Sequence, residues 1–203
     1  MKLRISAAEL IAAQDIIDVK DNVCLIIIRI VCQDDQYAIV ATNGYALAEF
    51  TSKHISDDFD CGQCFFKPSS VKKFLKAADR FVDIYFDGIA GIRLTAISKS
   101  GDVRDSVVID CVASSLFPID DSVDKVFLSG AKPAPEVAHM NASCLCKVIK
   151  GIERAYGKNT SMTICVSGER PPLQCNASYI ESHGLDITRK SFRGTLMPLN
   201  VEH

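Results

Sequence analysis

The residues with the most obvious chemical potential are two cysteines, Cys61 and Cys64, in the sequence CGQC. A CxxC pair holds zinc when a second close pair completes the site, and it carries redox chemistry when it opens a helix after a strand. The next close pair, Cys144 and Cys146, lies about eighty residues further on in a helical pattern. CGQC itself precedes FFKPSS, which has the pattern of a strand followed by a helix start. We therefore interpret Cys61 and Cys64 as unpaired thiols.

Acidic residues and histidines give no stronger indication of catalysis. Asp120, Asp121 and Asp124 could together hold a cation, but an acidic loop after a strand is more typical of solvated surface. The four histidines are scattered, and the sequence contains no glycine-rich phosphate loop, HExxH or GxSxG. We therefore expect a non-catalytic protein that needs no cofactor and no metal.

Basic residues recur at helical spacing in two stretches. The members of these two faces are Lys72, Lys73, Lys76 and Arg80 in the first stretch and Lys147, Lys150 and Arg154 in the second. A basic helix face can be simple solvated surface, or it can contact phosphates. The first predicted helix carries Glu9, Asp15 and Asp18 instead. Because the net charge is −2, any affinity for nucleic acid must come from such a local patch.

Composition places the chain among globular proteins. It has 203 residues, of which 48% are hydrophobic and 24% are charged. The most apolar run, CLIIIRIV, is too short to span a membrane and contains Arg29. The first residues lack the apolar segment of a signal peptide, and nine cysteines at irregular spacing are typical of a reducing compartment. We expect a cytoplasmic protein with no membrane contact.

The elements that must position these residues form a repeat of one strand, one helix and three strands. The first copy covers residues 3–53, with Ser6 as the predicted N-cap and Glu9 as its capping-box partner. A second copy follows from residue 64 to 113, with a predicted helix over 71–81, and a third begins near 137. In the third copy, the stretch around GLDITRK has no clear assignment. Such a unit leaves sheet edges open, so units should pair edge to edge with their helices on one side.

One hairpin is indicated by ATNGYALAEF at 41–50. Asn-Gly readily adopts positive φ at both central positions of a two-residue turn, so Asn43 and Gly44 are predicted to form that turn.

Three separated stretches resemble the bacterial sliding clamp, the beta subunit of the replicative DNA polymerase. ATNGYALA resembles the family's A-T-D-G-H-R-L-A, SLFPIDDSV resembles R-F-P-D-Y-x-x-V, and GTLMPLNV resembles the terminal V-x-M-P-M-R-L. The resemblance implies an α+β, DNA-clamp-like fold of three β-α-β-β-β repeats, with antiparallel sheets and helices on one face. It divides the chain into a clamp-like domain of two units at 1–127, a linker at 128–136 and a half domain at 137–203. The family has six such units in a chain.

The resemblance also implies a pocket for short peptides of polymerases, clamp loaders and repair proteins. Carried over by position, the pocket residues are Thr42, Gly44, Tyr45, Leu47, Pro118, Val123, Thr195, Met197, Pro198 and Leu199. Glycine lets a peptide backbone approach closely, and methionine adapts to apolar ligands.

The family's helices line a central hole, which makes the seven basic residues candidates for sequence-independent contact with double-stranded DNA. The resemblance implies a DNA replication processivity factor that acts as a homo-oligomer. Any polymerase activity would belong to the polymerase holoenzyme and not to this chain. The alternative is an adaptor or decoy that keeps the pocket without encircling DNA, and a third interpretation is a purely structural remnant of a clamp.

Overall fold

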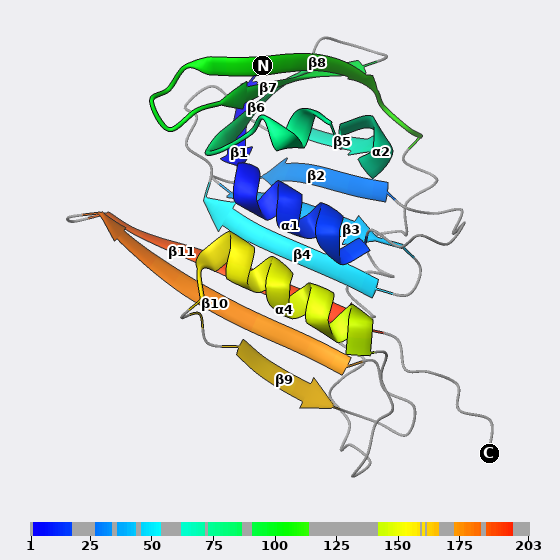
Figure 1. Cartoon of the computed structure of the whole chain (residues 1–203), viewed down its shortest axis with the longest axis vertical. Helices are drawn as coiled ribbons and strands as arrows, with labels where there is room; N and C mark the ends of the chain where they lie inside the picture. The colour runs from blue at the N-terminus through cyan, green and yellow to red at the C-terminus, as the bar shows by residue number, and fades with distance from the viewer. Residues whose placement is uncertain are drawn as a thin grey trace.

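The computed structural model describes residues 2–17, 27–33, 36–43, 46–53, 62–71, 73–86, 91–113, 142–158, 160, 162–166, 173–183 and 186–196. They form two antiparallel sheets with helices on one side (Figure 1). One sheet has four strands in the order β1-β6-β7-β8, and the other has seven in the order β5-β2-β3-β4-β11-β10-β9.

The strands follow the runs of alternating or continuous apolar residues. Their bounds are β1 Lys2–Ser6, β2 Ile27–Gln33, β3 Gln36–Thr42, β4 Ala46–Lys53, β5 Gly62–Phe66, β6 Phe81–Phe86, β7 Gly91–Ile97, β8 Val103–Asp110, β9 Met162–Val166, β10 Leu173–His183 and β11 Asp186–Leu196. The helices are α1 Ala7–Ile17, α2 Pro68–Val71, the 3-10 turn η1 Phe74–Lys76, and α4 Ala142–Tyr156. No helix of the described residues is long and apolar enough to cross a membrane.

The first two repeats exchange their first strands. β1 pairs with β6, the first of the three later strands of the second repeat, while β5 pairs with β2 of the first repeat. Each sheet therefore contains strands from both repeats, and the two sets of strands occupy equivalent positions. This exchange covers one edge of each three-strand set, which leaves β4 and β8 as the corresponding outer strands.

The third repeat joins the first by extending its sheet. β11 pairs antiparallel with β4, from Ser191 opposite Thr51 to Leu196 opposite Ala46. α4 lies beside α1 on the helix side (Figure 1). Phe192 of β11 packs against Phe50 of β4 with ring centroids 4.8 Å apart, and Tyr156 of α4 lies 6.0 Å from Phe50. We call this junction of β4 with β11 and α1 with α4 the seam.

The main core lies between the sheets and the helices. α1 contributes Leu10, Ile16 and Ile17, which are at most 3% exposed, and η1 contributes Phe74 and Leu75. Burying each such side chain stabilises the fold by about 1.5–3 kcal/mol before the loss of chain entropy.

A buried polar network fixes the start of α1 against the sheet. The Glu9 N–H donates to Ser6 Oγ over 3.4 Å, which is the first half of the predicted capping box. The Ser6 N–H donates to the hydroxyl of Tyr37, and that hydroxyl donates to the Glu9 carboxylate over 2.6 Å, so a tyrosine from β3 bridges the two members of the box. Ser52 Oγ donates to the other Glu9 oxygen over 2.6 Å. Burial and the Glu9 charge raise the pKa of Tyr37 well above its usual value, so it remains a donor.

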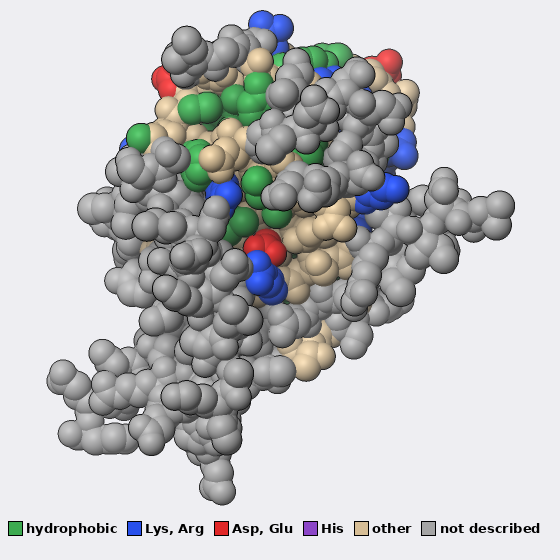
Figure 2. Space-filling view, turned by 180° about the vertical axis from the view of Figure 1, so that it is seen from behind, with side chains coloured by type: hydrophobic (Ala, Val, Ile, Leu, Met, Phe, Trp, Pro, Cys, Tyr) green, Lys and Arg blue, Asp and Glu red, His purple; other side chains and the backbone are tan. Residues whose placement is uncertain are grey.

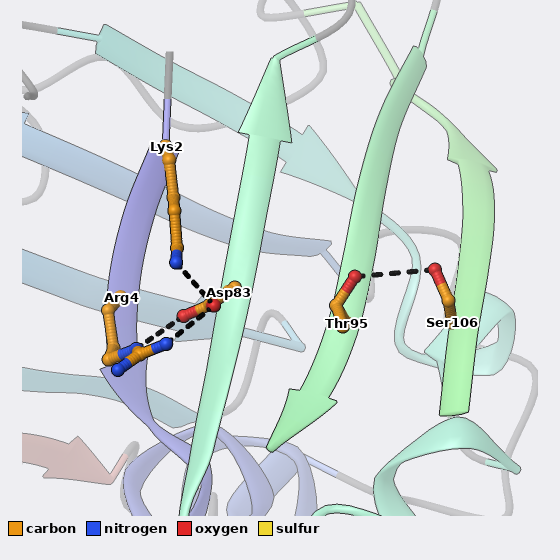
Figure 3. Close-up of polar contacts among 5 residues, drawn as sticks. All are labelled: Lys2, Arg4, Asp83, Thr95 and Ser106. Atoms are coloured by element: carbon orange, nitrogen blue, oxygen red, sulfur yellow. Dashed lines mark hydrogen bonds and ion pairs between the residues drawn. The ribbon is translucent and has the colours of Figure 1, made fainter. Parts of the chain in front are cut away.

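The four-stranded sheet carries a polar row on its face away from the helices. Arg4 donates two hydrogen bonds to Asp83, at 2.6 and 2.8 Å, and Lys2 lies 2.9 Å from the same carboxylate (Figure 3). Thr95 and Ser106 continue the row with hydroxyl oxygens 3.3 Å apart. Only 2% of the Asp83 side chain is exposed, so the side chains of Lys2 and Arg4 replace water as partners of the carboxylate.

One expectation about the elements needs correction, and one open assignment is settled. The helix predicted over 71–81 is wrong: α2 ends at Val71, and the following residues form the single turn η1, although Phe74, Leu75 and Ala78 are buried as their spacing predicts. In the third repeat, β11 begins at Asp186 and includes the unassigned stretch GLDITRK from that residue onward. The start of the third repeat, predicted near residue 137, lies outside the described residues.

Candidate functional site

The turn after β3 is shifted by one residue from its predicted position. The Asn43 N–H donates to the Ala46 carbonyl over 3.2 Å, and the Ala46 N–H donates to Asn43 Oδ1 over 2.8 Å. Asn43 and Ala46 therefore close the hairpin, and the two residues between them are Gly44 and Tyr45. The prediction that Asn43 and Gly44 occupy the central positions is wrong, because the asparagine side chain is used to close the turn.

Asn43 also ties this turn to the first helix. Its Nδ2 donates to the carbonyl of Ile17, the last residue of α1, over 3.4 Å. The last carbonyls of a helix have no partner within the helix, so this bond satisfies one of them. Asn43 is 1% exposed. The turn therefore contacts the end of α1 and holds the start of β4 in a fixed place.

Three predicted pocket residues occupy neighbouring positions on three adjacent strands. Thr42 of β3 lies opposite Leu47 of β4, and Leu47 lies opposite Thr195 of β11. Thr42 and Leu47 are buried, at 7% and 9% exposed. Two of the three sequence stretches are thus brought together at the seam by backbone pairing.

Leu47 belongs to a small apolar cluster on the face of the sheet away from the helices. The cluster consists of Val40, Leu47 and Phe65, with Ala38 and Val112 packed against it. Neighbours along each strand, such as Ala46 and Ala48, belong to the main core, as expected because successive strand residues face opposite sides. We call these five residues the outer cluster.

Val112 brings the chain that follows β8 to this cluster. Its N–H donates to the carbonyl of Phe65 over 2.8 Å, so the chain crosses the edge of β5 directly after β8. The second predicted pocket stretch, 115–123, begins three residues later. The first and third stretches therefore meet at the seam, and Val112 packs against the same outer cluster to which Leu47 belongs.

Charged residues lie in the next row of the same face. Arg193 of β11 donates two hydrogen bonds of 2.8 Å to the Glu49 carboxylate of β4, which closes the seam with a bidentate ion pair. Arg29 of β2 lies over the Phe65 ring at 5.8 Å. Burial lowers the pKa of Arg29, against an opposing effect of Glu49. On this face, Figure 2 shows hydrophobic side chains gathered in the upper half, with acidic and basic atoms side by side below them.

The other predicted pocket residues lie outside the described part of the chain. They are Gly44, Tyr45, Pro118, Val123, Met197, Pro198 and Leu199, and for Thr195 the description is limited to its backbone pairing. Sequence reasoning missed Val40, Phe65 and Val112 of the outer cluster and the Glu49–Arg193 pair. Strand alternation could have placed Val40 and Leu47 on one face, but no local pattern indicates that β4 pairs with β11.

The first group of predicted DNA-binding residues does not form a helix face. Lys73, Lys76 and Arg80 are exposed, on or near η1, while Lys72 lies outside the described residues. Arg80 donates to the carbonyl of Lys99 over 3.2 Å and lies 4.8 Å from the Phe81 ring. The prediction that these residues share one face of a regular helix is therefore wrong, since η1 is a single 3-10 turn that ends at Lys76.

The second group lies on α4 as predicted. Lys150 and Arg154 are exposed and Lys147 is partly buried, while Val148 and Ile152 face the core. Arg154 forms an ion pair with Asp15 of α1, in which about half of each side chain is exposed. Glu9, one of the three acidic residues named for the first predicted helix, is fully buried. The helix side thus presents basic groups, one of which already has an acidic partner.

The cysteines of the described residues are free thiols, of which Cys32 and Cys64 are buried. Cys64 is a buried free thiol whose pKa is raised by burial, and Cys61 lies outside the described residues, as do Asp120, Asp121 and Asp124. Within the described ranges, no group of three His, Cys, Asp or Glu residues is placed to hold a metal ion.

Comparison with known proteins gives structural likeness without sequence likeness. No family model matches the chain, and no curated protein matches it. Among solved structures, the chain aligns along 100% of its length with 99% of A. fulgidus PCNA bound to the C-terminal region of FEN-1, at a TM-score of 0.59 and 8% identity. The likeness to PCNA shows the sliding-clamp fold, which confirms the fold expected from the sequence.

Bacterial clamps are also among the similar structures. The DNA polymerase III beta subunits of Pseudomonas aeruginosa and Thermotoga maritima match at 10% and 12% identity, with TM-scores of 0.48 and 0.49. The alignments cover 100% and 99% of this chain. The chain spans 66% and 65% of those two proteins.

Proposed function

We propose that this chain, which has the sliding-clamp fold, is a non-catalytic DNA replication or repair factor that binds short apolar peptide segments of polymerases, clamp loaders or repair proteins. The observation that supports the proposal is the meeting of Thr42, Leu47 and Thr195 on three adjacent strands. PCNA, which shares the fold, is bound by the C-terminal region of FEN-1. A short peptide is therefore a ligand class to which this fold is suited.

The proposed peptide site lies on the outer side of the seam. The β4–β11 pairing provides a continuous, rigid floor. The outer cluster supplies an apolar foundation through Leu47 and Val112. We propose that Met197, Pro198 and Leu199, which directly follow β11, and Pro118 and Val123, which follow Val112, complete the walls. Apolar walls with a few polar groups are typical of such sites.

A peptide titration tests this site. A fluorescent peptide of about ten residues ending in alternate leucines and a phenylalanine is titrated with the protein, and anisotropy is measured. Met197→Asp should weaken peptide binding by tenfold or more. An apolar peptide would strip water from the carboxylate without offering it a hydrogen bond, and this desolvation is costly. Val103→Asp, at an exposed position on β8, is the matched control and should bind as the parent does. Equal affinity for both variants would place the peptide elsewhere, and absence of binding would leave the structural-remnant interpretation.

We further propose that the helix side contacts double-stranded DNA without sequence preference, within an oligomer of this chain. The supporting observation is the exposed basic set Lys73, Lys76, Lys150 and Arg154 on the side where the helices lie. The test is retention on a closed circular plasmid compared with the same plasmid after linearisation. A ring that encircles DNA is retained on the circle and lost from the linear form. Equal retention on both would contradict encirclement.

A second function, an adaptor or decoy that binds the same peptides without encircling DNA, is favoured by one specific observation. Two of the candidate phosphate contacts are already engaged, Arg80 with the Lys99 carbonyl and Arg154 with Asp15. Such a protein would compete with a full clamp for a shared peptide. It would show the peptide affinity described above together with no preference for circular DNA.

A further inference from the structure

A row of charged side chains crosses the seven-stranded sheet on the face away from the helices, next to the proposed peptide site. Backbone pairing places Arg29 of β2 opposite Val40 of β3. Glu49 of β4 lies opposite Val40 on one side and opposite Arg193 of β11 on the other. Residues that lie directly opposite each other share one face of a sheet. We call Arg29, Val40, Glu49 and Arg193 the charged row.

The rows on either side of the charged row carry no charge. One consists of the three residues at the proposed peptide site, and the other consists of small or polar residues: Thr42, Leu47 and Thr195 in the first, and Ala38, Thr51 and Ser191 in the second. The charged row holds two arginines and one glutamate, a net charge of +1. Adjacent rows on one face are two residues apart along each strand, or about 7 Å. A net positive charge therefore lies about 7 Å from the proposed apolar site.

Within the charged row, the positive charge is the more accessible one. Arg193 donates from Nε and Nη2 to the two Glu49 oxygens, each over 2.8 Å, and Thr51 Oγ1 donates to Glu49 Oε1 over 3.3 Å. The Glu49 side chain is 13% exposed, whereas that of Arg193 is 38% exposed. A ligand on this surface therefore meets the Arg193 guanidinium more readily than the Glu49 carboxylate.

Arg29 adds a second positive charge in surroundings that disfavour it. Its side chain is half-buried and lies 5.8 Å from the centroid of the Phe65 ring. Burial lowers the pKa of Arg29, and the charge of Glu49 offsets only part of this effect. An additional anion near a partly desolvated guanidinium stabilises its charged form. The charged row would thus be stabilised by a carboxylate that a ligand brings.

A peptide that covers the outer cluster would also remove water from the charged row. Val40 belongs to both, and Leu47 lies in the adjacent row. Removing water from a net positive row costs free energy unless the ligand supplies an anion, and a basic side chain on the ligand would be repelled. An extended peptide advances about 3.3 Å per residue. An acidic residue two places from an apolar residue over Leu47 would therefore reach the charged row.

We propose that the charged row selects peptides that carry an acidic side chain two residues from their apolar anchor, with Arg193 as its main contact and Arg29 as a second positive charge. This inference rests on the proposed peptide-binding function and adds to it the chemistry of the partner. An arginine and a carboxylate form short, charge-assisted hydrogen bonds, so the same row that attracts an acidic side chain excludes a basic one.

Three peptides test this selection. They share the apolar ending of the titration above, end in an amide, and carry glutamate, glutamine or lysine two places before the first leucine. The amide removes the terminal carboxylate, so any preference for the first peptide over the second is due to the side chain. Fluorescence anisotropy should show the glutamate peptide bound about fivefold more tightly than the glutamine peptide, and the lysine peptide more weakly than both. Added salt should reduce these differences.

Variants of the protein change the charge of the row. Arg193→Gln and Arg29→Met each lower it to zero, so the ratio of the glutamine-peptide Kd to the glutamate-peptide Kd should fall toward one. Glu49→Gln raises the charge to +2 and should increase the ratio. Each ratio compares two peptides on one protein, so a change in seam stability or apolar contact cancels. Arg93→Gln, at an exposed position of β7 in the other sheet, is the matched control and should keep the parent ratio.

The outcomes separate the selection from the site itself. Equal Kd values of the parent for the glutamate and glutamine peptides would overturn the selection and leave the peptide site standing. A parent ratio retained in both Arg193→Gln and Arg29→Met would also overturn it, because the carboxylate would then be bound elsewhere. If the parent bound none of the three peptides, the proposed peptide-binding function would fail, and this inference would fail with it.

Discussion

At the scale of single residues, Asn43 shows how one side chain can join two elements. It closes the β3–β4 hairpin with Oδ1 and contacts the end of α1 with Nδ2. Glycine is required at a turn only for its backbone freedom, whereas this asparagine is used for its amide. The same residue that suggests a simple turn in the sequence therefore sets the position of β4, and with it the position of Leu47 in the outer cluster.

Replacing Asn43 tests this double role. Asn43→Ala leaves the Ala46 N–H and the Ile17 carbonyl without their amide partners in a buried place, so the free energy of unfolding should fall by about 1–3 kcal/mol. Urea unfolding followed by circular dichroism measures the change. Asn43→Asp keeps the acceptor but loses the donor. If Asn43→Asp lowered the free energy of unfolding more than Asn43→Ala does, the main cause would be the burial of a charge and not the missing hydrogen bond to Ile17.

A second prediction concerns Asp83 and the pH dependence of stability. Burial raises the pKa of this carboxyl, but the hydrogen bonds and charges of Arg4 and Lys2 outweigh burial and hold the pKa below its usual value. A carboxylate with a lowered pKa contributes stability above its unfolded pKa of about 3.9, and that contribution is lost as the pH falls through the folded pKa. Asp83→Asn should therefore cost about 2 kcal/mol at pH 7.

The difference between parent and Asp83→Asn should shrink as the pH falls below about 4, where the parent loses the same charge. Urea unfolding at pH 7 and at pH 3 makes the comparison. Asp79→Asn, at an exposed position, is the control and should change little at either pH. If Asp83→Asn lowered the free energy of unfolding equally at both pH values, the charge of Asp83 would not be what stabilises the sheet.

At the scale of elements, strands were predictable and their partners were not. Runs of apolar residues indicate most of the described strands, and the run QYAIVAT coincides with β3, Gln36–Thr42. β11 is the exception, because the stretch GLDITRK with which it begins has no clear assignment in the sequence. The helix over 71–81 failed because Val71, Phe74, Leu75 and Ala78 can be buried by a short helix followed by a 3-10 turn as well as by a regular helix. So short a segment has little helical stability of its own, and tertiary contacts decide its form.

The candidate site was only partly predictable for a related reason. Thr42 and Leu47 belong to one hairpin, so a local turn pattern brings them together. Their neighbour Thr195 arrives through β11, whose partner strand is chosen by contacts across the whole fold. The resemblance to clamps supplied that stretch, since no periodicity in the sequence does so. The missed ion pair of Glu49 with Arg193 depends on the same long-range pairing.

The helix contact at the seam gives a prediction for an element. Gly151 of α4 packs on α1 so closely that a Cβ would lie 2.8 Å from Ile16 Cδ1 and 2.9 Å from Ile16 Cγ1. Alanine is better than glycine in a helix by about 1 kcal/mol, yet Gly151→Ala should lower stability or leave it unimproved because Ile16 must move. Thermal unfolding measures this effect. Combining Gly151→Ala with Ile16→Val, which removes the nearest methyl group, should recover part of the loss.

Glu153 provides the control on the same helix. Glu153→Ala changes an exposed position of α4 and should alter the unfolding temperature little. If Gly151→Ala raised stability by the full helix-propensity gain, the helices would have room to separate, and the close contact at Ile16 would not restrict the seam.

At the scale of the whole molecule, the balance of charge on the helix side decides how strongly it can attract DNA. The chain as a whole has a net charge of −2, so attraction depends on the local basic set opposing that charge. Asp15 lies on α1 and pairs with Arg154 of α4. A phosphate that binds Arg154 must therefore displace Asp15 or share the cation with it.

Neutralising Asp15 should consequently strengthen DNA binding, if the helix side is the surface that contacts DNA. The ion pair is about half exposed and contributes little to stability, so Asp15→Asn should fold as the parent does. We expect its affinity for a labelled duplex to rise several-fold, with a steeper dependence on salt, because one more cation can replace a counterion at the phosphates. Arg154→Ala should change both quantities in the opposite direction. Asp105→Asn makes the same charge change on exposed β8, and equal effects of Asp15→Asn and Asp105→Asn would show that total charge, and not this surface, governs binding.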